Sequence, residues 1–257
     1  MRSILIDKNR LYDAYEASSH GLYSDAEPFK SVELIENYRH YWRPEKVRVI
    51  LLAESHVYTS DVDRTQTIKP LLGLDNYPTE YAKFVYCLGY GEKELTSGEC
   101  HPKRDGTPQF WKLFFSCLHK IHSNSDFAPI LKSTTSFKQR IQSKLDLLSS
   151  LQSEGIWLVD ASIVALYHQG KKPEPERIHR AVKSSWDRYT SKVLEEANPD
   201  HIVVIGKGVA QTLQQDLQKC FKNKVTVLPQ PNARLSSEQQ RNNFQTCFRI
   251  CSSVKAV

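Results

Sequence analysis

Four short runs of apolar, largely β-branched residues constrain the fold of this chain more than any other feature. They cover residues 47–53, 156–159, 202–205 and 225–228. Each run is nearly continuous rather than alternating, which is typical of strands that are covered on both faces. Segments with helical periodicity separate the runs. This order predicts a three-layer α/β/α sandwich with a central four-stranded parallel sheet, whose functional residues gather at the carboxyl ends of the strands.

Apolar periodicity and capping residues indicate where the helices lie. We expect helices that begin near Thr107, Phe137, Pro175, Val209 and Ser236. A chain of 257 residues with 40% hydrophobic content is long enough to bury one sizeable core. We therefore expect a single domain over residues 1–257, with an N-terminal helical extension at 1–45 and an insertion-like region at 59–150.

Composition limits the partners and the compartment. Thirty-five Lys and Arg against 29 Asp and Glu give a net charge of +6, which favours a polyanionic partner without requiring one. No segment approaches the roughly 20 apolar residues of a membrane span. The six cysteines form no C-x-x-C pair and no secretory leader is apparent, so we expect a cytoplasmic protein with reduced thiols. Cys247 and Cys251 share an apolar helical stripe, which favours core residues over metal ligands.

Polar side chains follow three of the predicted strands. Glu54 and His56 come after the first strand, Asp160 after the second and Gln230 after the fourth. Because the carboxyl ends of parallel strands meet at one edge of a sheet, we expect these residues to converge on one cleft. Each signal is weak by itself, since an Asp after a strand is more often a helix cap or a turn residue, and a lone His is more often structural.

The order and spacing of these segments resemble the uracil-DNA glycosylase superfamily. That family runs a strand into G-E-A-P-G or G-Q-D-P-Y-H, a second into L-L-N and a third into H-P-S. The corresponding segments here are Leu52-Ala53-Glu54-Ser55-His56, Gly155-Ile156-Trp157-Leu158-Val159-Asp160-Ala161-Ser162 and Gln230-Pro231-Asn232-Ala233-Arg234-Leu235. Residues 183–189 and 204–210 are similar to its K-x-x-G-W-x-x-F helix and its hydrophobic-G-x-x-A turn. The resemblance covers residues 47 to about 250, matches poorly between 60 and 150, and reproduces no motif letter for letter.

The resemblance implies a monofunctional DNA glycosylase, which flips a base out of DNA and hydrolyses its N-glycosidic bond to leave an abasic site. It assigns to Glu54 the carboxylate that stabilises the cationic sugar and orients water. Gln230 takes the place of the family's histidine as the donor to the departing base. An amide stabilises that anion less than an imidazole, which implies a slower enzyme or a more labile base. His56 is either a further catalytic contributor or a structural residue.

Asp160 stands where the family's uracil readers have asparagine. An ionised carboxylate only accepts hydrogen bonds, so it would repel O4 of uracil and accept from the N4 amino group of cytosine. This implies a modified cytosine as substrate, such as glucosylated hydroxymethylcytosine in phage DNA, and hence a role in antiviral defence. Three alternatives remain open: a repair glycosylase for uracil or other deaminated bases, a catalytically weak DNA-binding member, or a nucleotide- or sugar-binding α/β enzyme of another class.

The resemblance also places a set of residues near the DNA. The candidates for stacking on the base are Phe84, Tyr86 and Tyr58, and those for contact with the strand are Arg234, Asn232, Lys171, Lys172 and Lys207. Each also has an ordinary explanation as a core aromatic residue or a solvated polar side chain. No iron–sulfur cluster is expected, because the cysteine spacing does not fit the branches that carry one. We expect a monomer with no cofactor and no metal.

Overall fold

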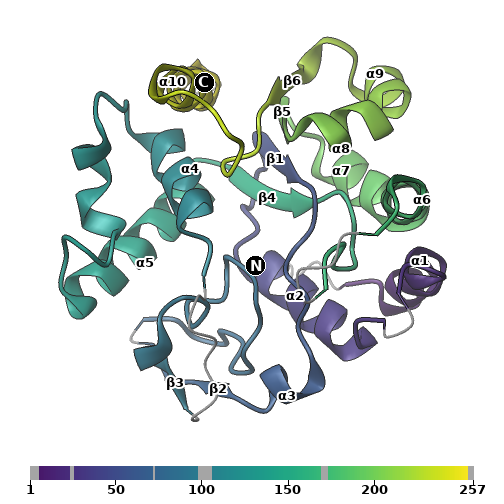
Figure 1. The fold of residues 1–257 in the computed structure, drawn as a ribbon, viewed down its shortest axis with the longest axis horizontal. Coiled ribbons are helices and arrows are strands. Elements are labelled where there is room, and N and C mark those ends of the chain that lie inside the picture. The colour runs from purple at the N-terminus through teal and green to yellow at the C-terminus, as the bar shows by residue number, and fades with distance from the viewer. Residues whose placement is uncertain (1–5, 24–25, 72, 98–105, 169–172, 254–257) are drawn as a thin grey trace. The chain divides into compact units, whose positions relative to one another are not determined.

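A computed structural model of the chain describes residues 6–23, 26–71, 73–97, 106–168 and 173–253. A four-stranded parallel sheet lies at its centre, in the order β4-β1-β5-β6 (Figure 1). Its strands are β1 (Val49–Ala53), β4 (Ile156–Asp160), β5 (His201–Ile205) and β6 (Val225–Leu228). All four predicted strands are confirmed, and the fold is the predicted α/β sandwich.

The burial of the strands explains why their sequences are apolar throughout. Every residue of β1 and β4 is buried, as is every residue of β5 after His201. Of the two edge strands, β4 is thus fully buried, whereas in β6 Val227 keeps 47% of its surface exposed. Central strands of a parallel sheet are covered on both faces, so alternation of polar and apolar residues disappears from their sequences.

The described helices follow the predicted order. They are α1 (Lys8–Ser19), α2 (Phe29–Tyr41), α3 (Asp61–Arg64), α4 (Pro108–Leu118), α5 (Phe137–Ser153), α6 (Pro175–Ser185), α7 (Ser191–Ala197), α8 (Lys207–Thr212), α9 (Gln214–Phe221) and α10 (Ser237–Ser253). Short 3-10 turns cover Lys93–Leu95, Asn124–Ile130 and Lys222–Lys224, and a π-helical turn, Trp186–Thr190, joins α6 to α7.

Local chemistry accounts for several helix boundaries. Pro108 occupies the first turn of α4, where its missing N–H costs no hydrogen bond. Ser236 and Gln239 form the predicted capping box of α10: the Ser236 N–H donates to Gln239 Oε1 at 2.9 Å, and the Gln239 N–H donates to Ser236 Oγ at 3.2 Å. The helix predicted over 209–217 divides at Leu213, which ends α8 and precedes α9.

The chain divides into two compact units. The first consists of Met1–Tyr41, Ala53–Gly106 and Val159–Glu196; the second consists of Trp42–Leu52, Thr107–Leu158 and Ala197–Val257. β1 and β4 therefore begin in the second unit and end in the first. In the first unit α1 packs beside α6 (Figure 1), and in the second α4 packs against α5 and α10. The prediction of one domain stays a prediction.

The region expected to be insertion-like contributes packed structure to both units: residues 59–106 belong to the first, and α4 and the start of α5 belong to the second. Residues Thr67–Ile68 (β2) and Thr96–Ser97 (β3) form a short antiparallel pair. The Tyr77 hydroxyl donates to the Tyr86 carbonyl at 2.8 Å and accepts from the Leu88 N–H at 2.8 Å. These buried hydrogen bonds hold the irregular backbone in place of a regular ladder.

Candidate active site

Glu54 follows directly after β1, and its backbone is fixed by the chain that leaves β4. The Ala161 N–H donates to the Ala53 carbonyl at 2.7 Å, and the Ser162 N–H donates to the Glu54 carbonyl at 3.0 Å. The side chain is partly exposed, and its Oε2 accepts a hydrogen bond from the Tyr167 hydroxyl at 3.1 Å. Burial and the neighbouring Glu54 carboxylate raise the pKa of Tyr167 to about 12, so the phenol stays protonated and remains a donor.

The order of the strands gives the carboxyl end of β1 a special position. β4, the next strand of the sheet along the chain, lies on one side of β1, while β5 and β6 lie on the other. The order therefore reverses at β1. In open parallel sheets, ligands bind beyond the carboxyl ends of the strands at such a reversal. Glu54 is the carboxylate that the chain places at this point.

His56 lies inside the first unit between two carboxylates. Its Nε2 is 2.8 Å from Glu27 Oε2, and its Nδ1 is 3.5 Å from Asp160 Oδ2. Burial by itself would lower the pKa of His56, but the charges and hydrogen bonds of Glu27 and Asp160 outweigh it and raise the pKa to about 9. The imidazolium is therefore the favoured form at neutral pH. This environment agrees with the structural alternative for His56.

Asp160 ends β4 and is 3% exposed. Its Oδ2 accepts from Arg39 Nη2 at 2.7 Å, in addition to the contact with His56. The guanidinium of Arg39 also pairs with Glu36 and lies over the ring of Phe84, 5.1 Å from its centroid. Asp160 thus belongs to a buried ion network within the first unit, and its predicted role as a reader of the base stays a prediction.

Glu27 is a buried residue beside the candidate site that the sequence did not indicate. It is 3% exposed, and its carboxylate accepts from the Thr59 N–H and the Ala165 N–H, each at 2.9 Å, as well as contacting His56. Thr59 follows β1 and Ala165 follows β4, so one carboxylate ties together the two segments that leave the sheet. The sequence carries no signal for this role, because Glu27 lies 29 residues before His56 and outside any motif.

Gln230 belongs to the second unit, in the loop that follows β6. The loop turns tightly, since the Ala233 N–H donates to the Gln230 carbonyl at 2.9 Å. Gln230 packs against Gly206, which has a φ of +113°; a Cβ added at Gly206 would lie 3.0 Å from Gln230 Cγ. Glycine is needed here for its backbone conformation and for the close approach of this amide side chain.

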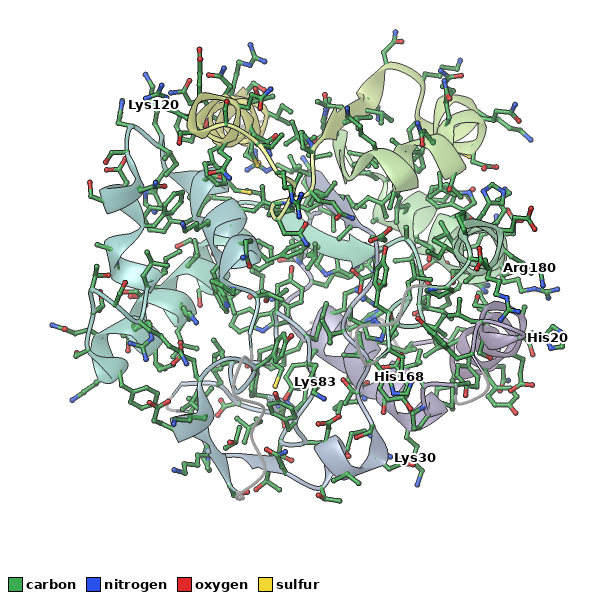
Figure 2. All side chains as sticks on the ribbon, viewed as in Figure 1. His20, Lys30, Lys83, Lys120, His168 and Arg180 are labelled. Atoms are coloured by element: carbon green, nitrogen blue, oxygen red, sulfur yellow. The ribbon has the colours of Figure 1, made fainter. Side chains whose placement is uncertain are left out.

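The aromatic candidates differ in exposure. Phe84 and Tyr86 are 3% and 2% exposed, and their rings meet edge to face with centroids 5.4 Å apart. Both have the environment of core residues. Tyr58 is partly exposed and stacks on His168 (labelled in Figure 2), with ring centroids 3.8 Å apart and planes 11° from parallel. Of the three candidates for stacking on a base, Tyr58 is the most exposed residue, and His168 covers one face of its ring.

The polar residues expected at the DNA strand are at the surface where the structure describes them. Asn232 and Arg234 are exposed in the loop after β6, and Lys207 is exposed in the first turn of α8. Lys171 and Lys172 lie outside the described residues. Accessible cations suit a polyanionic partner.

Comparison with protein-family models, with curated proteins and with solved structures found no match to this chain. The resemblance to the uracil-DNA glycosylase superfamily therefore stays a prediction based on the order of the segments. Among the described residues, no helix combines the length and the apolar character that crossing a membrane requires. The predicted cytoplasmic location and monomeric state stay predictions.

Proposed function

We propose that this chain is a DNA glycosylase, with Glu54 as the carboxylate that stabilises the cationic sugar and orients the attacking water. The observation that carries the proposal is the placement of Glu54. It offers a partly exposed carboxylate at the strand end where the sheet order reverses, on backbone fixed by Ser162 and beside the Tyr167 hydroxyl.

The chemistry of base release matches such a carboxylate. When the N-glycosidic bond breaks, its electron pair leaves with the base and the sugar becomes oxocarbenium-like. Water then adds to the anomeric carbon and loses a proton. A carboxylate near that carbon stabilises the cation and accepts a hydrogen bond from the water. Glu27 and Asp160 are buried in ion contacts, whereas the Glu54 side chain is accessible.

A DNA substrate is supported by charge and by exposed side chains. The net charge of +6 favours association with a polyanion, and Lys207 and Arg234 are exposed cations. The donor role of Gln230 stays part of the proposal. A modified cytosine as substrate, and with it the antiviral role, depends on Asp160, whose Oδ2 is engaged by Arg39. The choice of base is therefore left to experiment.

The test is an excision assay on the purified full chain. Labelled single- and double-stranded oligonucleotides would carry uracil, cytosine, hydroxymethylcytosine or glucosylated hydroxymethylcytosine at one position, and alkali would cleave any abasic product. We expect one of the modified or deaminated bases to give cleavage. Cleavage of uracil alone would refute the interpretation of Asp160 as a reader of cytosine. It would still support the proposal that the chain is a DNA glycosylase.

Glu54→Gln is the informative variant, because it removes the charge and keeps the shape. We expect excision to fall roughly 100-fold or more, with DNA binding by fluorescence anisotropy unchanged. Glu94→Gln, an exposed carboxylate of the first unit, is the matched control and should excise like the wild type. Binding without excision of any base in the wild type would identify a DNA-binding protein and contradict the proposal.

A further inference from the structure

Three cysteines meet inside the second unit. The Sγ atoms of Cys117, Cys247 and Cys251 all lie within 4.8 Å of one another, and that of Cys117 is 3.4 Å from that of Cys247. The three residues are 2%, 0% and 4% exposed. The sequence places Cys247 and Cys251 on a core stripe, but nothing in it predicts that Cys117, which precedes Cys247 by 130 residues, lies at the same point.

Two packed helices hold the three sulfur atoms. Cys117 is in the last turn of α4, while Cys247 and Cys251 are one turn apart on α10, which packs against α4. Residues at i and i+4 of a helix share a face, so both α10 thiols point to the same side. An ion bound here would connect the two helices.

A buried cation stands near this cluster. Arg48 is 5% exposed; its Nε donates to the Glu154 carbonyl at 2.8 Å, and its Nη2 lies 2.9 Å from Glu154 Oε2. Its buried Nη1 has no hydrogen-bond partner among the described residues. Arg48 and Cys251 interact electrostatically. A buried cation is costly unless opposite charge lies nearby, and a cluster of thiolates would supply that charge.

We propose that Cys117, Cys247 and Cys251 bind a single thiophilic metal ion, either Cu⁺ or Zn²⁺, as three thiolates. With metal–sulfur bonds of about 2.3 Å, two sulfur atoms on one ion lie about 3.7–4.0 Å apart, which falls between the 3.4 Å pair and the 4.8 Å limit of the cluster. Within the described residues, no His, Asp or Glu belongs to this group. A three-sulfur set suits Cu⁺, since structural Zn²⁺ prefers a fourth ligand.

The proton and charge balance is explicit. Each thiol exchanges its S–H proton for a bond to the metal, so three protons leave for each ion bound. The complex then carries a charge of −2 with Cu⁺ or −1 with Zn²⁺, and Arg48 supplies one opposite charge.

The test is metal titration of the full chain, kept reduced and free of oxygen after treatment with a chelator. Cu⁺ and Zn²⁺ would be titrated separately in competition with a chromophoric chelator. We expect one equivalent of at least one ion to bind, and Cys247→Ser or Cys251→Ser to weaken it beyond the roughly 100-fold seen for loss of an outer-shell partner. Cys220→Ser, an exposed cysteine of the same unit, and Cys87→Ser, a buried cysteine of the first unit, should bind like the wild type.

The proposal is independent of the glycosylase activity and can fail separately. No uptake by the wild type at one equivalent would overturn it, as would unchanged affinity in both cluster variants. If those variants do not fold, X-ray absorption of the metal-loaded wild type decides. Three sulfur neighbours at about 2.3 Å support the site, whereas nitrogen or oxygen neighbours in place of the three sulfurs contradict it.

Discussion

The two units differ in what they bury. Among the described residues, the first unit buries four carboxylates, Glu27, Glu36, Glu92 and Asp160, together with Arg39 and His56. The second unit buries the cations Arg48, Arg140 and Lys144 and a cluster of three thiols, but no carboxylate. A buried ion network is stable only when its partners are present together, because each charge that loses its partner must stay desolvated. Thiols impose no such condition and pack as small apolar groups. We infer that buried ion pairs stabilise the segments that leave β1 and β4. The free energy of unfolding of these segments should therefore change when a single charge is deleted and when the pH changes.

The largest expected effect is that of Asp160→Ala, which leaves the cations Arg39 and His56 without their shared carboxylate. We expect the free energy of unfolding to fall by roughly 3–5 kcal/mol. Urea unfolding would measure the loss, and hydrogen exchange would assign it to residues 53–60 and 159–166. Asp187→Ala removes an exposed partner of Lys183 and should cost at most about 1 kcal/mol. Equal, small losses in both variants would show that the buried ion network of the first unit contributes no more than an exposed ion pair of the same unit.

The pH dependence is the next effect in size. The folded pKa of His56 is about 9 against 6.5 for the free side chain, so its contribution is fully present below about pH 6.5 and is lost as the pH rises through 9. The difference corresponds to about 3 kcal/mol. Urea unfolding at pH 6 and pH 9.5 should show this loss in the wild type and not in His56→Gln.

His201, in the second unit, should give a pH dependence of stability opposite to that of His56. Burial lowers its pKa, so the sign is opposite: its contribution is present above pH 6.5 and is lost as the pH falls through the folded value. Hydrogen exchange should therefore show the first unit weakening toward alkaline pH and the region of β5 weakening toward acid. The same sign of response in both regions would contradict the assignment.

A smaller effect is expected in the second unit from Gly206→Ala. The new Cβ would meet Gln230 Cγ at 3.0 Å and would require a side chain at a φ of +113°. We expect a loss of about 1–3 kcal/mol in the free energy of unfolding. Gly73→Ala is the control for backbone strain, because Gly73 also has a positive φ, +81°, but has no atom within 4 Å of the added Cβ. If both variants lose the same amount, the contact with Gln230 has no energetic weight.

The smallest effect is that of Tyr167→Phe, which removes the hydrogen bond to Glu54 Oε2. A hydrogen bond of this kind is worth about 0.5–1.5 kcal/mol, so excision should slow roughly 2- to 10-fold. The pH profile of the rate separates a positioning role from a structural one, because only the former changes the apparent pKa on its acid side. An unchanged rate and profile would show that Tyr167 does not position Glu54.

The sheet could be predicted from the sequence because each of its strands can be recognised from a few consecutive residues. Each strand is a continuous apolar run, and Glu54 could be placed at a strand end once β1 was identified. The surroundings of Asp160 could not be predicted in this way. Its partner Arg39 lies 121 residues away on α2, and nothing near Asp160 distinguishes a buried ion pair from an accessible base reader.

The cysteine cluster could likewise be predicted only in part from the sequence. The helical stripe containing Cys247 and Cys251 is visible in the sequence, but the packing of α4 against α10 that adds Cys117 is not. Glu27 is a further case, since its role consists of contacts to two backbone N–H groups in distant loops. Contacts between distant segments depend on tertiary packing, which local periodicity does not encode.

The most direct measurement for the central claim is the release of free base from DNA, quantified by mass spectrometry together with the abasic strand. The wild type should release one base for each abasic site formed, and Glu54→Gln should reduce both products together by roughly 100-fold or more while it still binds the DNA. Release by Glu54→Gln at the wild-type rate would contradict the account.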